Sequence, residues 1–452
     1  MRHPDGTLTG MSSADSEHTG DPGELDDSVR IARDLIRFDT TNFGGGRSRG
    51  ESAAAQYTDE ILRGYGLSPQ IFESEPERTS VIARIPGRNP ARGALVLHGH
   101  LDVVPADPEH WSVDPFAGVI ADGLLWGRGA VDMKNMNAMI LTSVGDLMRS
   151  GEVPNRDLIV AFFADEEDTG TRGSTFMVNE HPEVFAGATE AISEVGGYSI
   201  DLDGRRAYLL QTGEKALVWG RLTARGDAAH GSRYVTDTAV TKLARAVAAL
   251  GNHKWPLRLT ATTRQLVVEL SSLLGVDPTM CGPDEVVLRT GSAAGFISAS
   301  LRTTSNPTVL EAGYKHNVIP ETASALIDIR PLPGEEDLVV AAVREIIGDE
   351  VEFEVVQRER GLESPFSGEL VTAMIASLNT HDPGAPVLPY LMPGGTDNKA
   401  LSMLGISGYG FAPLRLTGGL DFPAMFHGID ERIPLDALTF GRAVLGDLLR
   451  AL

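Results

Sequence analysis

The first residues with chemical potential are two histidines and an aspartate that follow an apolar run. His98, His100 and Asp102 come directly after the run 94–97. Side chains two positions apart on a strand point to the same face, so His100 and Asp102 can meet there. A histidine that binds metal usually donates its other ring N–H to a carboxylate, and Asp102 could provide that contact. The alternative is a histidine packed inside a strand, and for His98 we favour this packing role.

Acidic side chains and a further histidine follow in four more segments. Asp132 comes after a glycine-rich turn and before a predicted helix, and the acids Asp165–Asp168 follow an apolar run. Glu194 ends another apolar run, and His427 lies near the C-terminus. Each segment alone has a simpler interpretation: a helix N-cap for Asp132, a solvated acidic loop, and a structural histidine. Against this stands their location, since ligands in open α/β sheets bind outside the carboxyl ends of strands.

Together these side chains form the ligand set that a pair of divalent cations requires. Imidazole and carboxylate suit zinc without any thiolate. One carboxylate can bridge both ions. In two-metal sites about 3.5–4 Å apart, a water between the ions is acidified and the substrate oxygen is polarised. An additional carboxylate beside the ligands is the natural general base.

Strands that alternate with helices must position this set. The expected strands occupy 80–85, 94–104, 158–164 and 191–195. The expected helices occupy 28–38, 51–64 and 135–148. This alternation predicts an α/β catalytic domain with a largely parallel mixed sheet flanked by helices.

The pattern changes near residue 209. Expected elements are a strand at 215–224, a helix at 238–250, a strand leading to 317, a strand at 323–330, a helix at 337–347 and a strand at 351–357. We expect 252–306, rich in Thr, Ser, Gly and Pro, to be irregular. Without it the order is β-α-β-β-α-β, the ferredoxin-like pattern. The predicted organisation is a flexible N-terminal tail over 1–25, a catalytic domain over 26–212 and 359–452, and an inserted α+β domain over 213–358.

The composition excludes several classes of function. Lys and Arg number 39 and Asp and Glu number 62, so the 452 residues carry a net charge of −23. This balance argues against nucleic-acid binding and against docking on anionic membranes. A single cysteine, Cys281, excludes an intramolecular disulfide framework and a multi-cysteine zinc site. No apolar run is long enough to span a membrane, and the first residues lack the apolar segment of a signal peptide. We therefore predict a cytoplasmic protein.

The ordered motifs HLDVVP, GRGAVDMK, ADEED, SEVGG and FHGIDER resemble those of the M20 metallopeptidase family. The resemblance extends from about residue 28 to 452, and the family includes aminoacylases, desuccinylases, deacetylases and carboxypeptidases. It implies two Zn²⁺ ions, with Co²⁺ or Mn²⁺ as possible substitutes. The implied ligands are His100 and Glu194 for the first metal, Glu167 and His427 for the second, and Asp132 bridging both.

The same resemblance implies roles for the neighbouring residues. Asp102 would orient His100, and Glu166 would be the general base that moves a proton from the bridging water to the leaving nitrogen. It also implies a cis peptide between Asp132 and Met133. Glu194, where some relatives have Asp, weakly favours an aminoacylase or desuccinylase type.

The inserted domain resembles the family's lid, which implies a homodimer formed through it. His230 resembles a lid histidine that reaches the partner's active site and stabilises an oxyanion, although whether it acts in cis or in trans stays open. Arg330 and Asn317 would bind a substrate carboxylate, and the backbone N–H groups of Gly395 and Thr396 would meet it. The alternatives are a surface histidine, a surface ion pair for Arg330 and a plain turn at 395–396.

These inferences predict a zinc-dependent hydrolase that cleaves an amide bond in a small carboxylate-bearing substrate, such as an N-acyl amino acid or a dipeptide. A catalytically silent relative that acts as a binding or scaffold protein is the alternative, and a missing ligand or base would favour it. A serine or cysteine hydrolase is disfavoured, because Cys281 lies in the irregular stretch and the chain has no GxSxG motif.

Overall fold

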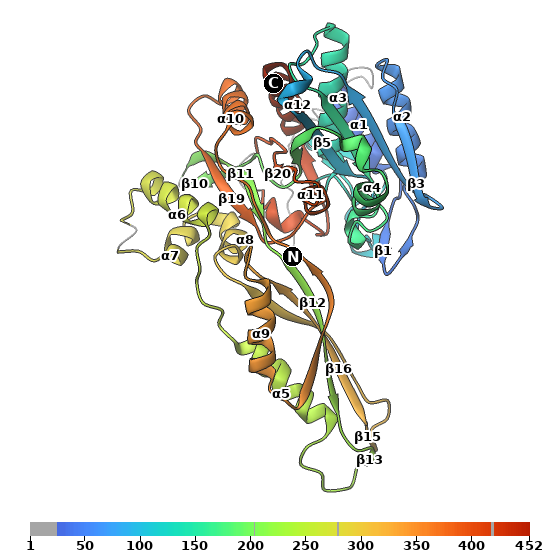
Figure 1. Ribbon diagram of the computed structural model, residues 1–452, viewed down its shortest axis with the longest axis vertical. Coiled ribbons are helices and arrows are strands. Elements are labelled where there is room, and N and C mark those ends of the chain that lie inside the picture. Colours follow the sequence, from blue (N-terminus) through green and yellow to red (C-terminus); the bar gives the residue numbers. More distant parts are fainter. Residues whose placement is uncertain (1–24, 203, 278–279, 417–419) are drawn as a thin grey trace, which may run out of the picture.

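A large mixed sheet and a small antiparallel sheet organise the chain in the computed structural model (Figure 1). The structure describes residues 25–202, 204–277, 280–416 and 420–452. Nearly all of the predicted N-terminal tail, residues 1–24, lies outside the described residues. Among the described residues, no helix is both long enough and apolar enough to cross a bilayer.

The large sheet has the strand order β10-β11-β20-β9-β5-β8-β4-β3, and β18 and β19 also pair with β11. Its strands are β3 (Gln70–Glu75), β4 (Arg78–Ile85), β5 (Ala94–His100), β8 (Leu158–Phe163), β9 (Ala188–Ser193), β10 (Tyr198–Leu202), β11 (Arg205–Glu214), β18 (Leu362–Glu363), β19 (Val387–Met392) and β20 (Ser407–Gly410). The central pairs β20–β9, β9–β5 and β5–β8 are parallel, whereas β4 and β3 continue the sheet antiparallel. The predicted mixed sheet with a parallel centre is confirmed.

Helices cover both faces of the large sheet because its central strands are apolar on both sides. Leu95 and Leu97 belong to one hydrophobic cluster, and Ala94 and Val96 belong to another. The helices are α1 (Asp27–Ile36), α2 (Ser52–Gly64), α3 (Lys134–Ser150), α4 (Ser174–Glu180), α10 (Glu369–His381), α11 (Asn398–Ser402) and α12 (Leu435–Ala451). Side chains of α1, α3 and α12 fill the first cluster, and those of α4 and α11 fill the second.

Shorter strands complete the surroundings of this sheet. They form a pair, β1 (Asn42–Gly44) with β2 (Arg47–Ser48), and a three-stranded sheet of β6 (Val119–Ala121), β7 (Leu124–Trp126) and β21 (Arg432–Pro434). β21 directly precedes α12 and pairs with β7, so the C-terminal segment is hydrogen-bonded to the 119–126 region.

The small sheet has the order β14-β16-β12-β17, and every pairing is antiparallel. Its elements are β12 (Leu217–Arg225), β14 (Thr304–Ala312), β16 (Thr322–Arg330), β17 (Val351–Glu359), α5 (Ala239–Asn252) and α9 (Glu336–Ile347). The two helices pack on the sheet around a separate hydrophobic cluster. This order is that of a ferredoxin-like βαββαβ unit, as predicted. At its far end a two-stranded ribbon joins β13 (Ala229–His230) to β15 (Val318–Ile319) (Figure 1).

The expectation that 252–306 is irregular is wrong. This stretch contains α6 (Ala261–Leu274), α7 (Pro283–Leu288) and α8 (Ala294–Ala299). The Thr residues that suggested a loop are capping residues, since Thr260 and Thr263 form a capping box at the start of α6. Leu266 and Leu270 are buried at helical spacing.

Hydrophobic side chains of these three helices pack in the core of the large sheet. Leu266 and Leu270 of α6 and Val286 of α7 belong to the same hydrophobic cluster as β5 and β8. The chain therefore returns to the large core in the middle of the segment predicted as the insertion. The boundaries 213–358 for an inserted domain stay a prediction.

Candidate active site

Three neighbouring parallel strands deliver predicted ligands to one edge of the large sheet. β5 ends at His100, Asp165–Asp168 follow β8, and Glu194 follows β9. β5 pairs with both β8 and β9 in parallel. The carboxyl ends of these strands therefore lie together, at the edge where open α/β sheets bind ligands.

Asp132 lies between the two histidines. Its Oδ1 is 3.2 Å from His100 Nε2, and its Oδ2 is 3.2 Å from His427 Nε2. Glu194 Oε1 is 3.7 Å from His100 Nε2, and Glu167 Oε2 is 3.2 Å from His427 Nε2. The structure thus brings together all five residues predicted as metal ligands, with one carboxylate oxygen of Asp132 toward each histidine.

Glu166 lies beside this cluster. Its Oε2 is 4.0 Å from His100 Nε2. Within the described residues, two sets of ligand atoms each lie within 4.8 Å of one another: His100, Glu166 and Glu194, and His100, Asp132 and Glu167. Glu166 is therefore close enough to act on a molecule bound at the ligands.

The cluster holds more negative charge than its own histidines balance. Burial, with the nearby charge of Asp132, raises the pKa of Glu194 to about 8. Burial is also the main reason that the pKa of Glu166 lies well above its usual value. Glu194 Oε2 is buried without a hydrogen-bond partner. An orphaned carboxylate oxygen next to imidazole nitrogens fits divalent cations bound by nitrogen and oxygen.

Asp102 contacts both His100 and the acidic loop. His100 Nδ1 lies 2.9 Å from the backbone carbonyl oxygen of Asp102 and 3.5 Å from its carboxylate Oδ1. The Asp102 carboxylate also accepts the backbone N–H groups of Glu166 and Glu167, each at 3.1 Å. The carbonyl thus makes the shorter contact to His100, and the carboxylate orients the segment that carries Glu166.

His98 is buried away from the ligands. Its Nε2 lies 2.9 Å from Asn398 Oδ1, and burial lowers the pKa of His98 to about 4. A neutral, hydrogen-bonded side chain agrees with the packing role predicted for this histidine.

Glu431 anchors the loop that carries Asp132. Its fully buried carboxylate accepts the backbone N–H groups of Gly129, Val131 and Asp132 and pairs with Arg128 at 2.8 Å. The Asp132–Met133 peptide is cis, as the family resemblance implies. Sequence reasoning missed this anchor, because Glu431 lies 299 residues from Asp132.

We expect Glu431→Ala to destabilise the protein and to reduce metal binding. Removing one partner of a buried ion pair leaves the other charge uncompensated, which costs about 3–5 kcal/mol. Urea denaturation and metal content after dialysis measure the two effects. Glu369→Gln, at an exposed ion pair with Arg92, is the control and should change neither. Wild-type stability and metal content in Glu431→Ala would contradict the anchor.

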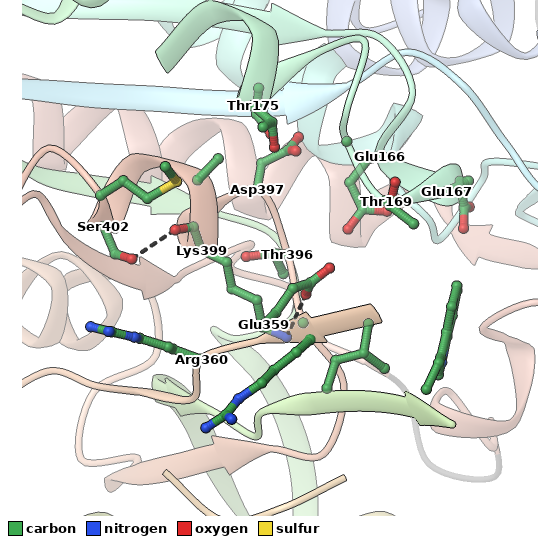
Figure 2. A pocket seen from close by; sticks show the side chains of 18 of the residues that line it. Glu166, Glu167, Thr169, Thr175, Glu359, Arg360, Thr396, Asp397, Lys399 and Ser402 are labelled. Carbon is green, nitrogen blue, oxygen red and sulfur yellow. Dashed lines mark hydrogen bonds and ion pairs between the residues drawn. The ribbon is translucent and has the colours of Figure 1, made fainter. Parts of the chain in front are cut away.

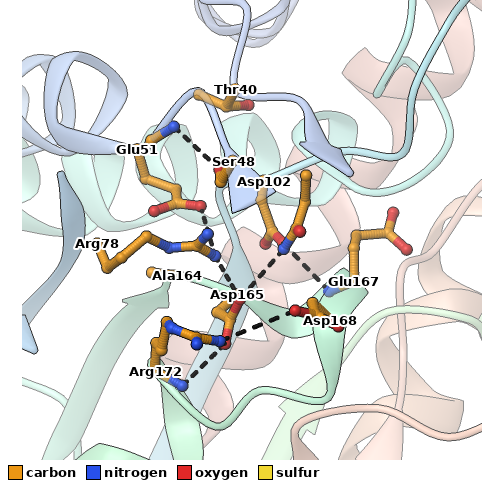
Figure 3. A network of polar contacts seen from close by, with 12 residues as sticks. Thr40, Ser48, Glu51, Arg78, Asp102, Ala164, Asp165, Glu167, Asp168 and Arg172 are labelled. Carbon is orange, nitrogen blue, oxygen red and sulfur yellow. Dashed lines mark hydrogen bonds and ion pairs between the residues drawn. The ribbon is translucent and has the colours of Figure 1, made fainter. Parts of the chain in front are cut away.

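A buried ionic network lies behind the acidic loop (Figure 3). Arg78 NH2 is 3.1 Å from Glu51 Oε1 and also pairs with Asp165. Asp165 adopts a left-handed φ of 66° and accepts the backbone N–H of Arg172 at 2.9 Å. Aspartate tolerates this conformation better than most residues. The network thereby holds the turn from β8 into Glu166.

A cavity of about 640 Å³ opens beside the ligands (Figure 2). Glu166, Glu167 and His427 line one side, whereas Trp219 of β12 and Arg330 of β16 come from the small sheet. A cavity of this size accommodates a small molecule. Substrate bound here would contact both sheets.

Some of the predicted carboxylate-binding groups lie in this cavity, and they differ in whether their donors are already hydrogen-bonded within the protein. Gly395, Thr396 and Arg330 all line it. However, Thr396 donates both its backbone N–H and its hydroxyl to Glu214, at 3.0 and 2.6 Å. Arg330 pairs with Asp328 through Nε at 2.7 Å and NH2 at 3.1 Å and keeps its other N–H groups. The Thr396 donors are therefore already used within the protein.

His230 and Asn317 are remote from the ligands of the same chain. They lie at the β13–β15 ribbon, at the end of the small sheet far from the large one (Figure 1). Both are exposed, and Asn317 accepts the backbone N–H of Gly231 at 2.8 Å. The structure places these two predicted residues together, but not in the cavity.

Among the cavity residues that were not predicted as site residues are Asp397 and Lys399. Asp397 is buried near Glu166, and burial raises its pKa to about 7. Lys399, on the first turn of α11, points into the cavity (Figure 2). Both follow Thr396 in the motif PGGTDNK, so extending the glycine-loop motif by three residues would have found them.

The chain is similar to known proteins along most of its length. The protein-family model described as Peptidase family M20/M25/M40 matches residues 96–451 of the chain. The chain is 29% identical to aminoacylase-1 of Sus scrofa over 436 residues, 94% of this chain and 95% of that protein. It is 28% identical to the N-fatty-acyl-amino acid synthase/hydrolase PM20D1 of Xenopus tropicalis, covering 91% and 83% of the two chains. Its fold is similar to that of an M20 family metallo-carboxypeptidase from Sulfolobus solfataricus, with a TM-score of 0.73, 19% identity, and coverage of 94% and 99%.

Proposed function

The chain belongs to peptidase family M20/M25/M40 and is a hydrolase of amide bonds, and from this premise we propose that it cleaves small amides that carry a carboxylate. N-acyl amino acids are the first candidates and dipeptides the second. Similarity to aminoacylase-1 along 94% of the chain supports this order.

One observation carries the proposal: Glu166 lines the cavity directly beside the five predicted ligands. A general base must lie within hydrogen-bond reach of the proton that it removes, or one water away. Glu166 meets this requirement for a water held at the ligands, and its backbone is fixed by Asp102.

His100, Glu194, Asp132, Glu167 and His427 would hold two divalent cations, which we propose to be Zn²⁺, with Co²⁺ or Mn²⁺ as substitutes. When bound, the cations lower the pKa of a water and polarise the scissile carbonyl. Glu166 would take a proton from the attacking water and pass it to the leaving nitrogen of the cleaved amide. Burial raises the pKa of Glu166 above its usual value, so its carboxyl holds a proton more readily than an exposed glutamate does.

The substrate carboxylate would bind at the part of the cavity formed by Arg330 and Gly395. Arg330 and Gly395 line the same cavity as Glu166. An arginine fork matches a carboxylate geometrically. Binding there would place the amide bond between the ligands and the small sheet.

We also propose that the protein is a homodimer in the cytoplasm and that His230, with Asn317, completes the partner's site. The exposed position of His230, remote from its own site, supports delivery in trans. We expect His230→Ala to lower kcat severalfold or more without loss of metal, since a positioned oxyanion donor is removed.

Steady-state kinetics and metal analysis check this prediction, and light scattering measures the mass of the particle. Lys315→Ala, an exposed residue of the same ribbon region, is the control. A strictly monomeric mass or unchanged turnover in His230→Ala would remove the proposed role.

The function itself is tested by a hydrolysis screen of the zinc-loaded protein. The panel contains N-acetyl and longer N-acyl amino acids, dipeptides, and carboxamide analogues that lack the free carboxylate. The proposal requires turnover of at least one carboxylate-bearing amide and poor turnover of its carboxamide analogue. Turnover of neither class would refute it.

A further inference from the structure

Lys399 lies across the glycine loop of the cavity. It belongs to α11, and its side chain folds back over Gly395. A Cβ at position 395 would lie 2.3 Å from Lys399 Nζ and 2.5 Å from its Cε. Glycine at 395 therefore leaves room for the lysine, and the ammonium sits where the loop backbone meets the cavity.

The Lys399 ammonium is largely shielded from water but has few acceptors. Its side chain is 10% exposed, and its hydrogen bond in the structure is to Glu359 Oε2 at 3.0 Å (Figure 2). An ammonium group has three N–H donors. Thr396 uses its own donors on Glu214, whereas the Lys399 ammonium has N–H donors beyond the one directed at Glu359 and can offer them to a ligand.

Glu359 already places a carboxylate at Lys399. It ends β17 of the small sheet and lines the same cavity. Its second oxygen, Oε1, accepts from Gln357 Nε2 at 2.8 Å. The ion pair thus joins the small sheet to α11, and Glu359 would keep one partner if Lys399 moved to another carboxylate.

We propose that Lys399 binds the carboxylate of the substrate and that Glu359 occupies this position until the substrate displaces it. This inference rests on the proposed function and identifies the residue pair that sets its requirement for a free carboxylate. A carboxylate can replace Glu359 because the lysine exchanges one anion for another. A neutral carboxamide cannot, because it would leave a shielded ammonium without a charged partner.

Substitutions of Lys399 and of Glu359 are expected to change the affinity for a carboxylate ligand in opposite directions. Lys399→Met removes the charged donor and should weaken carboxylate binding about tenfold or more, the range for hydrogen bonds to charged groups. Glu359→Gln removes the internal competitor and should tighten carboxylate binding severalfold, because less of the free protein is blocked. Neither change should affect binding of a carboxamide as strongly.

Calorimetry on the zinc-loaded, full-length protein tests this without turnover. The background is Glu166→Gln, and the probes are N-acetyl-L-methionine and N-acetyl-L-methioninamide. Lys399→Arg keeps the charge and should stay within a few fold of the parent. Glu354→Gln makes the same change as Glu359→Gln on the same strand, outside the cavity lining, and should have no effect. Thermal unfolding confirms that each variant is folded.

Each outcome decides the inference. Tighter binding in Glu359→Gln with weaker binding in Lys399→Met supports it. Equal affinity in Lys399→Met and Glu354→Gln, weaker binding in Glu359→Gln, or no binding of N-acetyl-L-methionine by the parent overturns it. Absence of hydrolysis in the screen, with the calorimetric pattern intact, would refute the proposed function only. Normal hydrolysis with unchanged affinities would refute this inference only.

Discussion

Replacing Glu166 by Gln is expected to lower kcat by about 10²–10⁴-fold, the range for loss of a general acid–base group. The amide keeps the size of the side chain but cannot take a proton. Because Glu166 is not among the five predicted ligands, the variant should retain its metals. Steady-state kinetics and elemental analysis of the same sample measure both properties.

The matched control is Glu180→Gln, which makes the same change at an exposed position of α4. It should leave kcat and metal content unchanged. A Glu166→Gln protein with full turnover and full metal content would show that another group moves the proton. Loss of metal together with activity would instead assign Glu166 to the ligands, as its place in one of the two ligand-atom sets allows.

Removing the metals is expected to abolish hydrolysis and to lower stability. A ligand that binds the folded state alone stabilises it by about 4 kcal/mol at a thousandfold excess over its Kd. Chelation followed by dialysis, with activity and thermal unfolding measured before and after readdition of Zn²⁺, tests this. Full activity after complete removal of the metals would contradict the proposed two-metal site.

The stability lost on chelation should also depend on pH. In the metal-free protein the pKa of Glu194 is raised to about 8, whereas an unfolded Glu titrates near its ordinary value of 4.5. The folded state then binds more protons than the unfolded state between these values, so its stability falls as pH rises from about 5 to 8. His427, whose pKa is raised to about 11 by Asp132 and Glu167, acts in the same direction above its ordinary value of 6.5.

Thermal unfolding of the chelated protein at several pH values checks this trend. Readdition of Zn²⁺ should restore more stability at pH 8 than at pH 5. An apoprotein that becomes more stable as pH rises through this window would contradict the arrangement of carboxylates described here.

Local patterns in the chain predicted the layers of the fold and the candidate metal-binding side chains, and the family resemblance implied which of them bind each metal. His100, the acids after β8 and Glu194 each follow an apolar strand, and the carboxyl ends of adjacent parallel strands must meet. Hydrophobic periodicity likewise reported the helices and the βαββαβ order of the small sheet. Where periodicity was masked by Thr and Gly, as in α6–α8, the prediction was wrong.

The amino-acid sequence alone thus determined the candidate ligands and base, because their residue types and the motifs around them are local properties of the chain. The tertiary structure decided which contacts hold these side chains in place and which hydrogen-bond donors of the site are already used within the protein. Only the folded structure shows that the Glu431 carboxylate accepts backbone N–H groups of the Asp132 loop, although Glu431 and Asp132 are 299 residues apart. Only the folded structure shows that Thr396 donates its N–H and hydroxyl groups to Glu214. It likewise places Lys399 against Glu359 and leaves His230 far from its own site. Such contacts join segments distant in the chain, and their geometry depends on how whole layers pack rather than on any local spacing.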